Sequence, residues 1–273
     1  MKNKSIWWMI LGAYLMSINI SNACSVLYYV DQHTGKIYVA NHEDYWYDVK
    51  AYIQIMPETK NKLARLWYGW DQFAQGGINE AGLFFDGAVT PRQNIPEGYG
   101  SPESNLGDEI LASCSTVEEA LTLLEKRKIA LADAHIMFGD STGNAVVVEW
   151  SAGEKKIVRI TDHQLMMTNF LLSDTTQGNY PCYRYAAMDK RVQELQHRDT
   201  AVSLLQVGNV LGGAAQPPVE DESGKVGGTV YSTFINITDM EFVLVYKLDN
   251  AKVTKLNLRQ EFATGKKKKI RLK

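Results

Sequence analysis

The residue best suited to covalent chemistry is Cys24, which follows the stretch Ser21-Asn22-Ala23. A thiol at its ordinary pKa is only about 3% thiolate at pH 7, so a reacting cysteine needs a base. A cut after Ala23 would give Cys24 its own base, the free α-amine, of which roughly a tenth is neutral at pH 7. Before the cut that nitrogen is a peptide amide and cannot accept a proton. Cleavage would therefore create a nucleophile together with its base.

The segment before Cys24 predicts such a cut. Lys2 and Lys4 precede an apolar run at 6–16, and the small residues Ser21 and Ala23 follow it. This is the pattern of a secretory leader, and the apolar run is shorter than the roughly 20 residues of a membrane-spanning helix. We therefore expect residues 1–23 to be a signal peptide and the mature protein to be exported, either periplasmic or secreted. Because no later segment is long and apolar enough, we expect no stable membrane insertion.

Three other interpretations of Cys24 remain open. Lipidation would make the protein an exported, membrane-tethered binding domain. However, a lipobox usually has an aliphatic residue where Ser21 stands, and the chain has no spacer before its first expected strand. A disulfide is less favoured because the chain has three cysteines, which leaves at least one thiol unpaired. Cys114 and Cys182 could pair or be separate buried thiols. Finally, Cys24 could simply be a small core residue.

The charge of the mature chain argues against a nucleic-acid partner. Loss of Lys2 and Lys4 leaves 27 Lys and Arg against 31 Asp and Glu, a net charge of −4. Six of the positive charges lie in the tail at 266–273. A basic run at a chain end is usually solvated, so we expect this tail to be disordered. The remaining part, residues 24–265, has the length of one sizeable domain.

The order of the expected elements predicts an α+β fold. Alternating or β-branched stretches predict strands, and turn residues separate them. Helices are expected from Thr116, which has capping-box spacing with Glu119, and in the amphipathic stretches at 182–196 and 199–211. The segment 90–107, rich in proline and glycine, is expected to be a loop facing a substrate. The expected strands lie at 24–30, 37–45, 49–56, 83–89, 135–140, 144–150, 155–161, 163–170, 229–239 and 240–249.

Metal or cofactor chemistry has little support in the sequence. The chain has no Walker A sequence, no HExxH and no GxGxxG that opens a helix. The nearest cluster of possible ligands is His42-Glu43-Asp44. On a strand, His42 and Asp44 would share one face and Glu43 would lie on the other, so a metal would need a third ligand from elsewhere. We expect no metal and no cofactor.

Seven short stretches follow one another along the chain: ACSVLYY, VANHEDYW, GGINEAGLFFDG, HIMFGDSTGNAVVVEW, MMTNF, YPCYRYAAM and TVYSTFINITDMEFVLVYKLDN. Together they resemble the choloylglycine hydrolase / penicillin V acylase family of N-terminal-nucleophile cysteine hydrolases, with its acid-ceramidase-like relatives. The resemblance implies a four-layer αββα sandwich and hydrolysis of a linear carbon–nitrogen amide.

The resemblance also implies a role for each catalytic residue. Cys24 would attack the amide carbonyl and form an acyl-thioester, while its α-amine carries the proton to the leaving amine. Asp44 would hold and orient the charged α-amine. Asn169 and Asn79 would donate hydrogen bonds to the oxyanion. Arg184 would stabilise the site through carboxylate contacts.

In one place the chain departs from the family pattern, because Asn41 stands where the family has an arginine three residues before the aspartate. Asparagine keeps a donor but loses the charge, so another arginine, Arg184 or Arg65, would have to act on the thiol. The expected partner is a small N-acyl amide of bile-salt, penicillin V or acyl-amine type. An acyltransferase on the same fold is the alternative, and a homo-oligomer is left open. Aromatic side chains at 45–47, 67, 68 and 70 are candidates for the walls of the acyl pocket.

Overall fold

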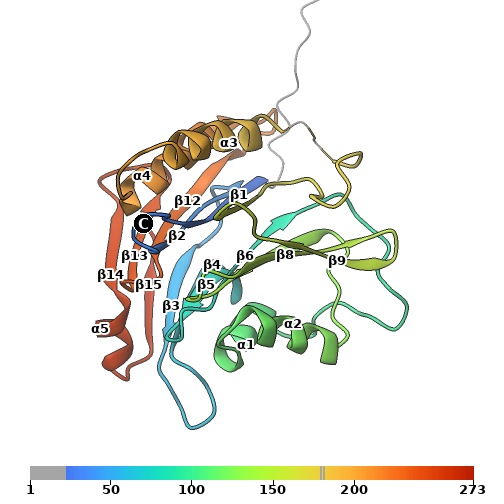
Figure 1. Ribbon diagram of the computed structural model, residues 1–273, viewed down its shortest axis with the longest axis horizontal. Helices are drawn as coiled ribbons and strands as arrows, with labels where there is room; N and C mark the ends of the chain where they lie inside the picture. The colour runs from blue at the N-terminus through green and yellow to red at the C-terminus, as the bar shows by residue number, and fades with distance from the viewer. Residues whose placement is uncertain (1–22, 179, 181) are drawn as a thin grey trace, which may run out of the picture.

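The protein is built in four layers, with two antiparallel sheets between two pairs of helices. The computed structural model describes residues 23–178, 180 and 182–273. Helices α3 (Tyr183–Gln196) and α4 (Leu204–Val210) cover the outer face of one sheet, and α1 (Leu106–Ser113) and α2 (Val117–Lys126) cover the outer face of the other (Figure 1). The predicted four-layer αββα sandwich is confirmed.

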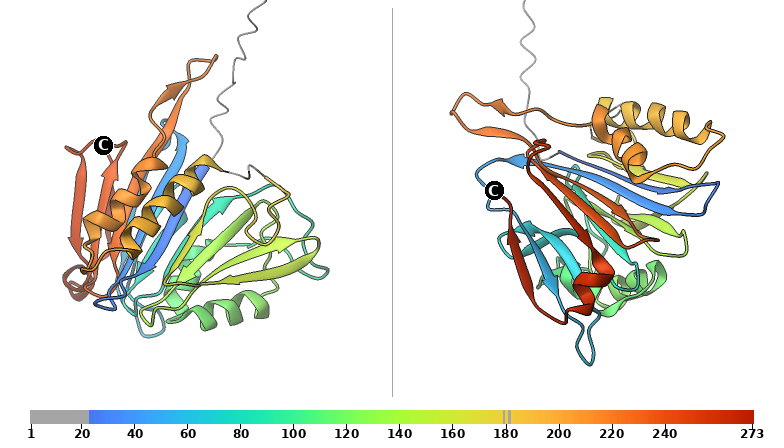
Figure 2. Two further views of the ribbon diagram at one scale, coloured as in Figure 1. Left: turned by 45° about the horizontal axis from the view of Figure 1, so that its top comes forward. Right: turned by 90° about the vertical axis from the view of Figure 1, so that its left-hand side faces the viewer.

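The first sheet contains β1, the strand that carries Cys24, and its two neighbours β2 and β10. Its strands run in the order β10-β1-β2-β12-β13-β14, with β11 paired to β12. Figure 2 shows α3 and α4 lying along these strands. The strands are β1 (Ala23–Val30), β2 (Ile37–Trp46), β10 (Gln164–Met167), β11 (Val219–Glu220), β12 (Val226–Asn236), β13 (Glu241–Tyr246) and β14 (Val253–Asn257).

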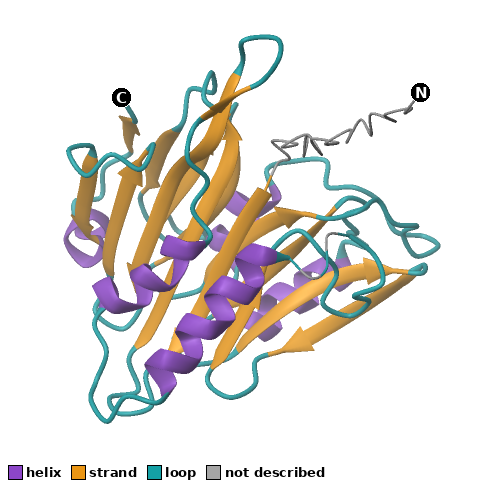
Figure 3. Ribbon diagram, turned by 90° about the horizontal axis from the view of Figure 1, so that it is seen from above, coloured by secondary structure: helices purple, strands orange, loops and turns teal. Residues whose placement is uncertain are grey.

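The second sheet has the strand order β15-β3-β4-β5-β6-β7-β8-β9. Seen from above, α3 and α4 lie in front of the strands, and α1 and α2 lie behind them (Figure 3). The strands are β3 (Tyr52–Met56), β4 (Arg65–Trp70), β5 (Phe73–Asn79), β6 (Phe84–Val89), β7 (Ala134–Gly139), β8 (Ala145–Ser151), β9 (Glu154–Arg159) and β15 (Lys268–Arg271).

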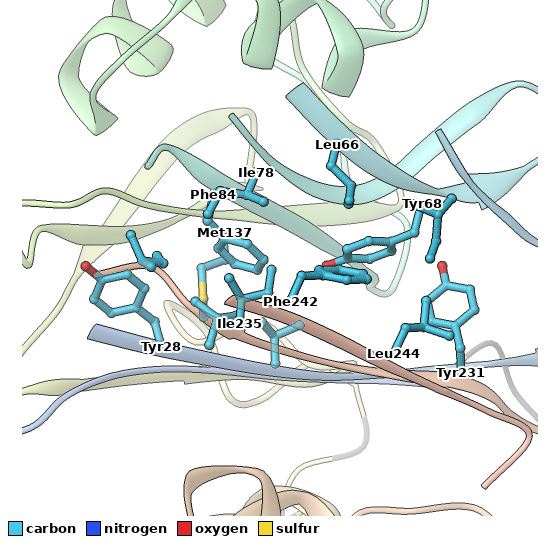
Figure 4. Packing of buried hydrophobic residues seen from close by; sticks show 14 of the residues in the cluster. Tyr28, Leu66, Tyr68, Ile78, Phe84, Met137, Tyr231, Ile235, Phe242 and Leu244 are labelled. Carbon is cyan, nitrogen blue, oxygen red and sulfur yellow. The ribbon is translucent and has the colours of Figure 1, made fainter. Parts of the chain in front are cut away.

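The main core lies between the two sheets. It packs Tyr68 and Phe84 of one sheet against Tyr231 and Phe242 of the other (Figure 4). The rings of Tyr68 and Tyr231 meet edge to face, with centroids 5.5 Å apart. Cys24 belongs to this same core, so the candidate nucleophile lies between the sheets, where rigid packing fixes its position.

Helix α2 begins where the sequence predicts it, whereas α1 was not predicted. Thr116 caps α2 and accepts a hydrogen bond from the backbone N–H of Glu119, as its capping-box spacing predicts. Helix α1, in contrast, begins inside the expected 90–107 loop. Gly107 is typical of a loop, but in α1 it has a packing role: a β-carbon at this position would lie 2.1 Å from the ring of Phe85. The glycine is needed so that α1 can approach β6 closely.

The expectation of a disordered tail is wrong. Strand β15 pairs with β3, and Ile270 packs against the core between the sheets. Lys268 pairs with Glu261 of α5 (Leu258–Ala263), and Lys269 lies over the ring of Tyr52. The lysines therefore lie on an edge strand, where charged side chains oppose further strand pairing.

Residues 1–22 of the predicted signal peptide lie outside the described residues. Among the helices that the structure describes, none is long and apolar enough to cross a membrane. Cys24, Cys114 and Cys182 are all free thiols and all are buried.

Candidate active site

Cys24 is the second residue of β1, the strand that the sequence predicts around it. The strand pairs with β2 on one side and β10 on the other, which fixes both its backbone and its side-chain direction. The side chain is only 4% exposed. Its Sγ lies 3.3 Å from Oε1 of Glu43, and its backbone nitrogen donates to Oδ1 of Asn169 at 3.0 Å.

Arg184 joins the backbone of Cys24 to Asn169. It lies in the first turn of α3, and its guanidinium reaches through to the sheet. Nη1 donates to the carbonyl oxygen of Cys24 at 2.9 Å, and Nη2 donates to Oδ1 of Asn169 at 2.8 Å. The same Asn169 oxygen accepts from the Cys24 nitrogen, so the three residues form one connected cluster. Asn169 Nδ2 donates to the carbonyl oxygen of Val89 at 2.8 Å.

Asp44 lies on β2, next to the start of β1. In the β1–β2 ladder it faces Ala23, the residue before Cys24. Its Oδ1 accepts a 2.6 Å hydrogen bond from Thr229, and its Oδ2 is 3.8 Å from Nη1 of Arg184. Four predicted site residues, Cys24, Asp44, Asn169 and Arg184, therefore lie together.

The structure does not bring Asn79 to this cluster. Asn79 ends β5, whereas the start of that strand, around Phe73, borders the cavity at Cys24. Its Nδ2 donates to the carbonyl oxygens of Leu111 and Cys114, and its Oδ1 accepts from two backbone N–H groups of the following turn. These bonds tie the β5–β6 turn to the end of α1.

Glu43 is the site residue that the sequence analysis missed. His42 and Asp44 do share a face of β2, as predicted, with His42 bonded to the carbonyl oxygen of Leu211 in the helical layer. The other face of the strand points to the core between the sheets, and there Glu43 meets Cys24. The only signal in the sequence is its position in the strand opposite Cys24.

Asn41 and Asp86 extend this inner face. Asn41 donates to Oδ1 of Asp86 at 3.0 Å and accepts from Thr233, and Tyr68 donates to Oδ2 of Asp86 at 2.8 Å. Asn41 therefore donates its hydrogen bond to the carboxylate of Asp86. Of the two candidate arginines, only Arg184 reaches the cluster, because Arg65 pairs with Asp108.

The electrostatics of the uncleaved chain oppose thiolate formation. Burial raises the pKa of the Cys24 thiol, and the carboxyls of Glu43, Asp44 and Asp86 raise it further. Burial also raises the pKa of Asp44 to about 7, against the hydrogen bond from Thr229 and the charge of Arg184. A positive charge at the Cys24 nitrogen would oppose both shifts.

We predict a pH signature for Asp44 in a chain that retains Ala23. The unfolded chain releases this proton near pH 3.8 and the folded chain near pH 7, so folding stability should fall as pH rises between these values. Asp44→Asn removes that loss. In urea unfolding, the free energy of unfolding of the variant should rise relative to that of the wild type by up to about 4 kcal/mol between pH 4 and pH 7, with no further rise above pH 7. A gain that shrinks as pH rises contradicts the assignment.

His135 and Glu149 hold the segment that carries Asn169. They form a fully buried pair between Nδ1 and Oε1 at 2.8 Å. Glu149 also accepts from the backbone N–H groups of Leu172 and Ser173, and His135 Nε2 contacts the carbonyl oxygen of Thr168. These bonds anchor the chain on both sides of Asn169.

A cavity of about 360 Å³ opens beside Cys24. Cys24 and Glu43 line it together with aromatic and aliphatic side chains from β2, β4, β5, β6 and β7. Of the predicted aromatic wall residues, Tyr45 and Trp70 line the cavity and stack on each other with centroids 5.0 Å apart. Trp67 instead donates to Asp108 in the outer layer. Within the described residues, no group of three or more His, Cys, Asp and Glu side chains could hold a metal ion.

Comparison with solved structures shows where this fold recurs. Penicillin V acylase from Agrobacterium tumefaciens matches with a TM-score of 0.68 at 19% identity, covering 87% of this chain and 87% of that chain. An arginine-to-leucine variant of conjugated bile acid hydrolase from Clostridium perfringens matches with a TM-score of 0.74 at 16% identity, covering 92% and 97%. At these identities the likeness shows the fold.

The family follows from the sequence itself. Comparison with curated proteins found no match. The model of the family described as acyl-coenzyme A:6-aminopenicillanic acid acyl-transferase matches residues 27–205, more than half of the chain. This chain therefore belongs to that family.

Proposed function

We propose that this protein is a cysteine amidase that hydrolyses the linear carbon–nitrogen bond of an N-acyl substrate. One observation carries the proposal: the nitrogen and the sulfur of Cys24 both lie within a buried polar cluster, beside a cavity large enough for an acyl group. An N-terminal nucleophile needs its thiol and its α-amine to be positioned by the same surroundings.

The proposed reaction has two halves. The α-amine of Cys24 takes the thiol proton, and the sulfur attacks the amide carbonyl. The tetrahedral intermediate collapses, the carbon–nitrogen bond breaks, and the α-ammonium gives its proton to the leaving amine. Water then attacks the acyl-thioester with the same amine as base. Asp44 and Asn169 hold the α-amine, and Arg184 holds the Cys24 carbonyl and Asn169 in place.

The cavity supports a substrate with a hydrophobic acyl part. Phe73, Phe85, Tyr45 and Trp70 contribute aromatic walls, and aliphatic side chains complete the lining. We propose the acyl group of a bile-salt, penicillin V or acyl-amine type of substrate there. The test is a panel of penicillin V, a glycine-conjugated bile salt, an acyl homoserine lactone and a long-chain N-acyl amine, with released amine and acid both measured. No turnover of any member would contradict the proposal.

Acyl transfer is the second candidate, because the matching family model carries the description of an acyl-transferase. An acyl-thioester can be resolved by an amine as well as by water. Adding 6-aminopenicillanic acid to the assay separates the two activities. A transferase converts it to the N-acyl product, whereas a hydrolase releases free acid at an unchanged rate.

We also propose that the protein is exported and that cleavage before Cys24 activates it. A lipid on the Cys24 sulfur is disfavoured, since the side chain is buried and β1 is already paired at Ala23. N-terminal sequencing of the protein from fractionated cells tests both points. The proposal requires a chain that begins at Cys24 and is found outside the cytoplasm.

A further inference from the structure

The cavity lacks one of the oxyanion donors that the sequence predicts. Attack on an amide carbonyl places a negative charge on its oxygen, which needs hydrogen-bond donors that are already in position. Asn79, predicted for this role, is held at the far end of β5 by the carbonyl oxygens of Leu111 and Cys114. In the part of the chain that the structure describes, the position beside Cys24 is occupied by Glu43 instead.

One carboxyl oxygen of Glu43 contacts the Cys24 thiol, and the other has no hydrogen-bond partner among the described residues. The side chain is 4% exposed and lines the cavity with Cys24. Oε1 accepts from the Cys24 thiol at 3.3 Å. Oε2 is buried and, among the described residues, has no hydrogen-bond partner. A buried carboxylate oxygen without a donor is costly, whereas a protonated one needs only an acceptor, which a substrate carbonyl would supply.

The groups around Glu43 favour its neutral form. The titratable side chains that face it are Cys24 on β1, Asp86 on β6, Tyr68 on β4 and Tyr231 on β12, with Asp44 beside it on β2. None of these is a cation in the chain that retains Ala23, whereas cleavage adds the α-amine of Cys24 to the groups near Glu43. Burial raises the pKa of Glu43, and the charges of Asp86 and Asp44 raise it further.

Asp86 is better placed than Glu43 to keep its charge. It accepts hydrogen bonds at both oxygens, from Asn41 and from Tyr68, and both bonds oppose the rise in pKa that burial causes. Among the described residues, Glu43 accepts only the weak bond from the thiol. If one of these two carboxyls holds a proton, the hydrogen bonds therefore favour Glu43 as the protonated one.

We propose that Glu43 reacts as a carboxylic acid and donates a hydrogen bond from Oε2 to the substrate carbonyl oxygen as it becomes the oxyanion; this rests on the proposed amidase function. As the carbon–sulfur bond forms, the carbonyl π electrons move to oxygen and are stabilised by the Glu43 O–H. When the carbon–nitrogen bond breaks, the carbonyl re-forms. Glu43 keeps its proton throughout, while the thiol proton travels through the α-amine to the leaving nitrogen.

The test compares Glu43→Gln, which keeps a donor, with Glu43→Met, which has similar length and no donor. With the panel substrate that the wild type turns over fastest, Glu43→Met should lower kcat by about 100-fold or more, the effect of losing one oxyanion donor. Glu43→Gln should stay within about tenfold of the wild type. Its rate should also lose the decline at alkaline pH that ionisation of Glu43 causes in the wild type. Equal losses in both variants would overturn the proposal.

Alkylation of Cys24 by iodoacetamide separates the donor role from a role as base, because this reaction forms no oxyanion. If Glu43 is a donor, neither variant should alkylate more slowly than the wild type at pH 7. If Glu43 takes the thiol proton, both variants should alkylate more slowly, which contradicts the proposal. Failure of the amidase function itself looks different: a Cys24→Ala variant would retain turnover, or the wild type would have none. Melting temperatures of both Glu43 variants confirm folding.

Discussion

Replacing Cys24 with alanine is expected to lower kcat by more than about 1,000-fold, because the variant retains the cavity and loses the only atom proposed to bond to the substrate. The fold should survive the change. Cys24 is a small side chain in the core between the sheets, and removal of its sulfur leaves its backbone bonds to Asn169 and Arg184 intact. Turnover is measured with the panel substrate that the wild type accepts.

Cys114→Ala is the matched control for this experiment. Cys114 is also a free, buried thiol, but it lies at the end of α1 beneath the second sheet and does not line the cavity at Cys24. Its replacement should cost similar stability and leave kcat unchanged. Equal activity losses in the two variants would indicate a folding defect. Unchanged turnover in Cys24→Ala would contradict the assignment of the nucleophile.

A residue retained before Cys24 is expected to lower kcat by about 100- to 10,000-fold, the usual range for loss of a general base. In such a chain the Cys24 nitrogen is an amide, which donates to Asn169 and cannot accept a proton. The thiol also remains near Glu43, Asp44 and Asp86 without the positive charge of an α-ammonium, so burial and these carboxyls keep its pKa raised.

Two chains separate these effects: one begins at Cys24 and the other begins at Ala23 and is blocked from processing. The chain that begins at Cys24 should be alkylated by iodoacetamide at lower pH, since its α-ammonium stabilises the thiolate. The extended chain should fold equally well, because Ala23 of β1 already pairs with Asp44 of β2. Equal turnover in the two chains would exclude the α-amine as the base.

The sequence predicts much of this site because its elements carry strong local signals. The β1–β2 hairpin follows from β-branched and aromatic residues around a glycine turn, and it brings Cys24 near Asp44. Glu43 was missed for a physical reason. Alternation along β2 separates its two faces, but both faces are buried, so hydrophobicity does not tell which one meets Cys24.

The other differences arise from contacts that are distant in the sequence. The role of Asn79 was inferred from a motif, whereas its side chain bonds to a carbonyl of α1. Helix α1 was not predicted, because Gly107, which lets the helix approach Phe85, is typical of a loop. The basic tail looked solvated because its charges dominate its composition. Its pairing with β3, about 215 residues earlier in the chain, is invisible to local patterns.

The most direct test of the account is mass spectrometry of the processed protein, rapidly quenched in acid after mixing with its substrate. We expect a chain that begins at Cys24 and carries the acyl group on the peptide containing Cys24, with hydroxylamine removing the group as expected for a thioester. A chain that retains Ala23 while active, a diacylglycerol on the Cys24 sulfur, or an acyl group on any other residue would contradict it.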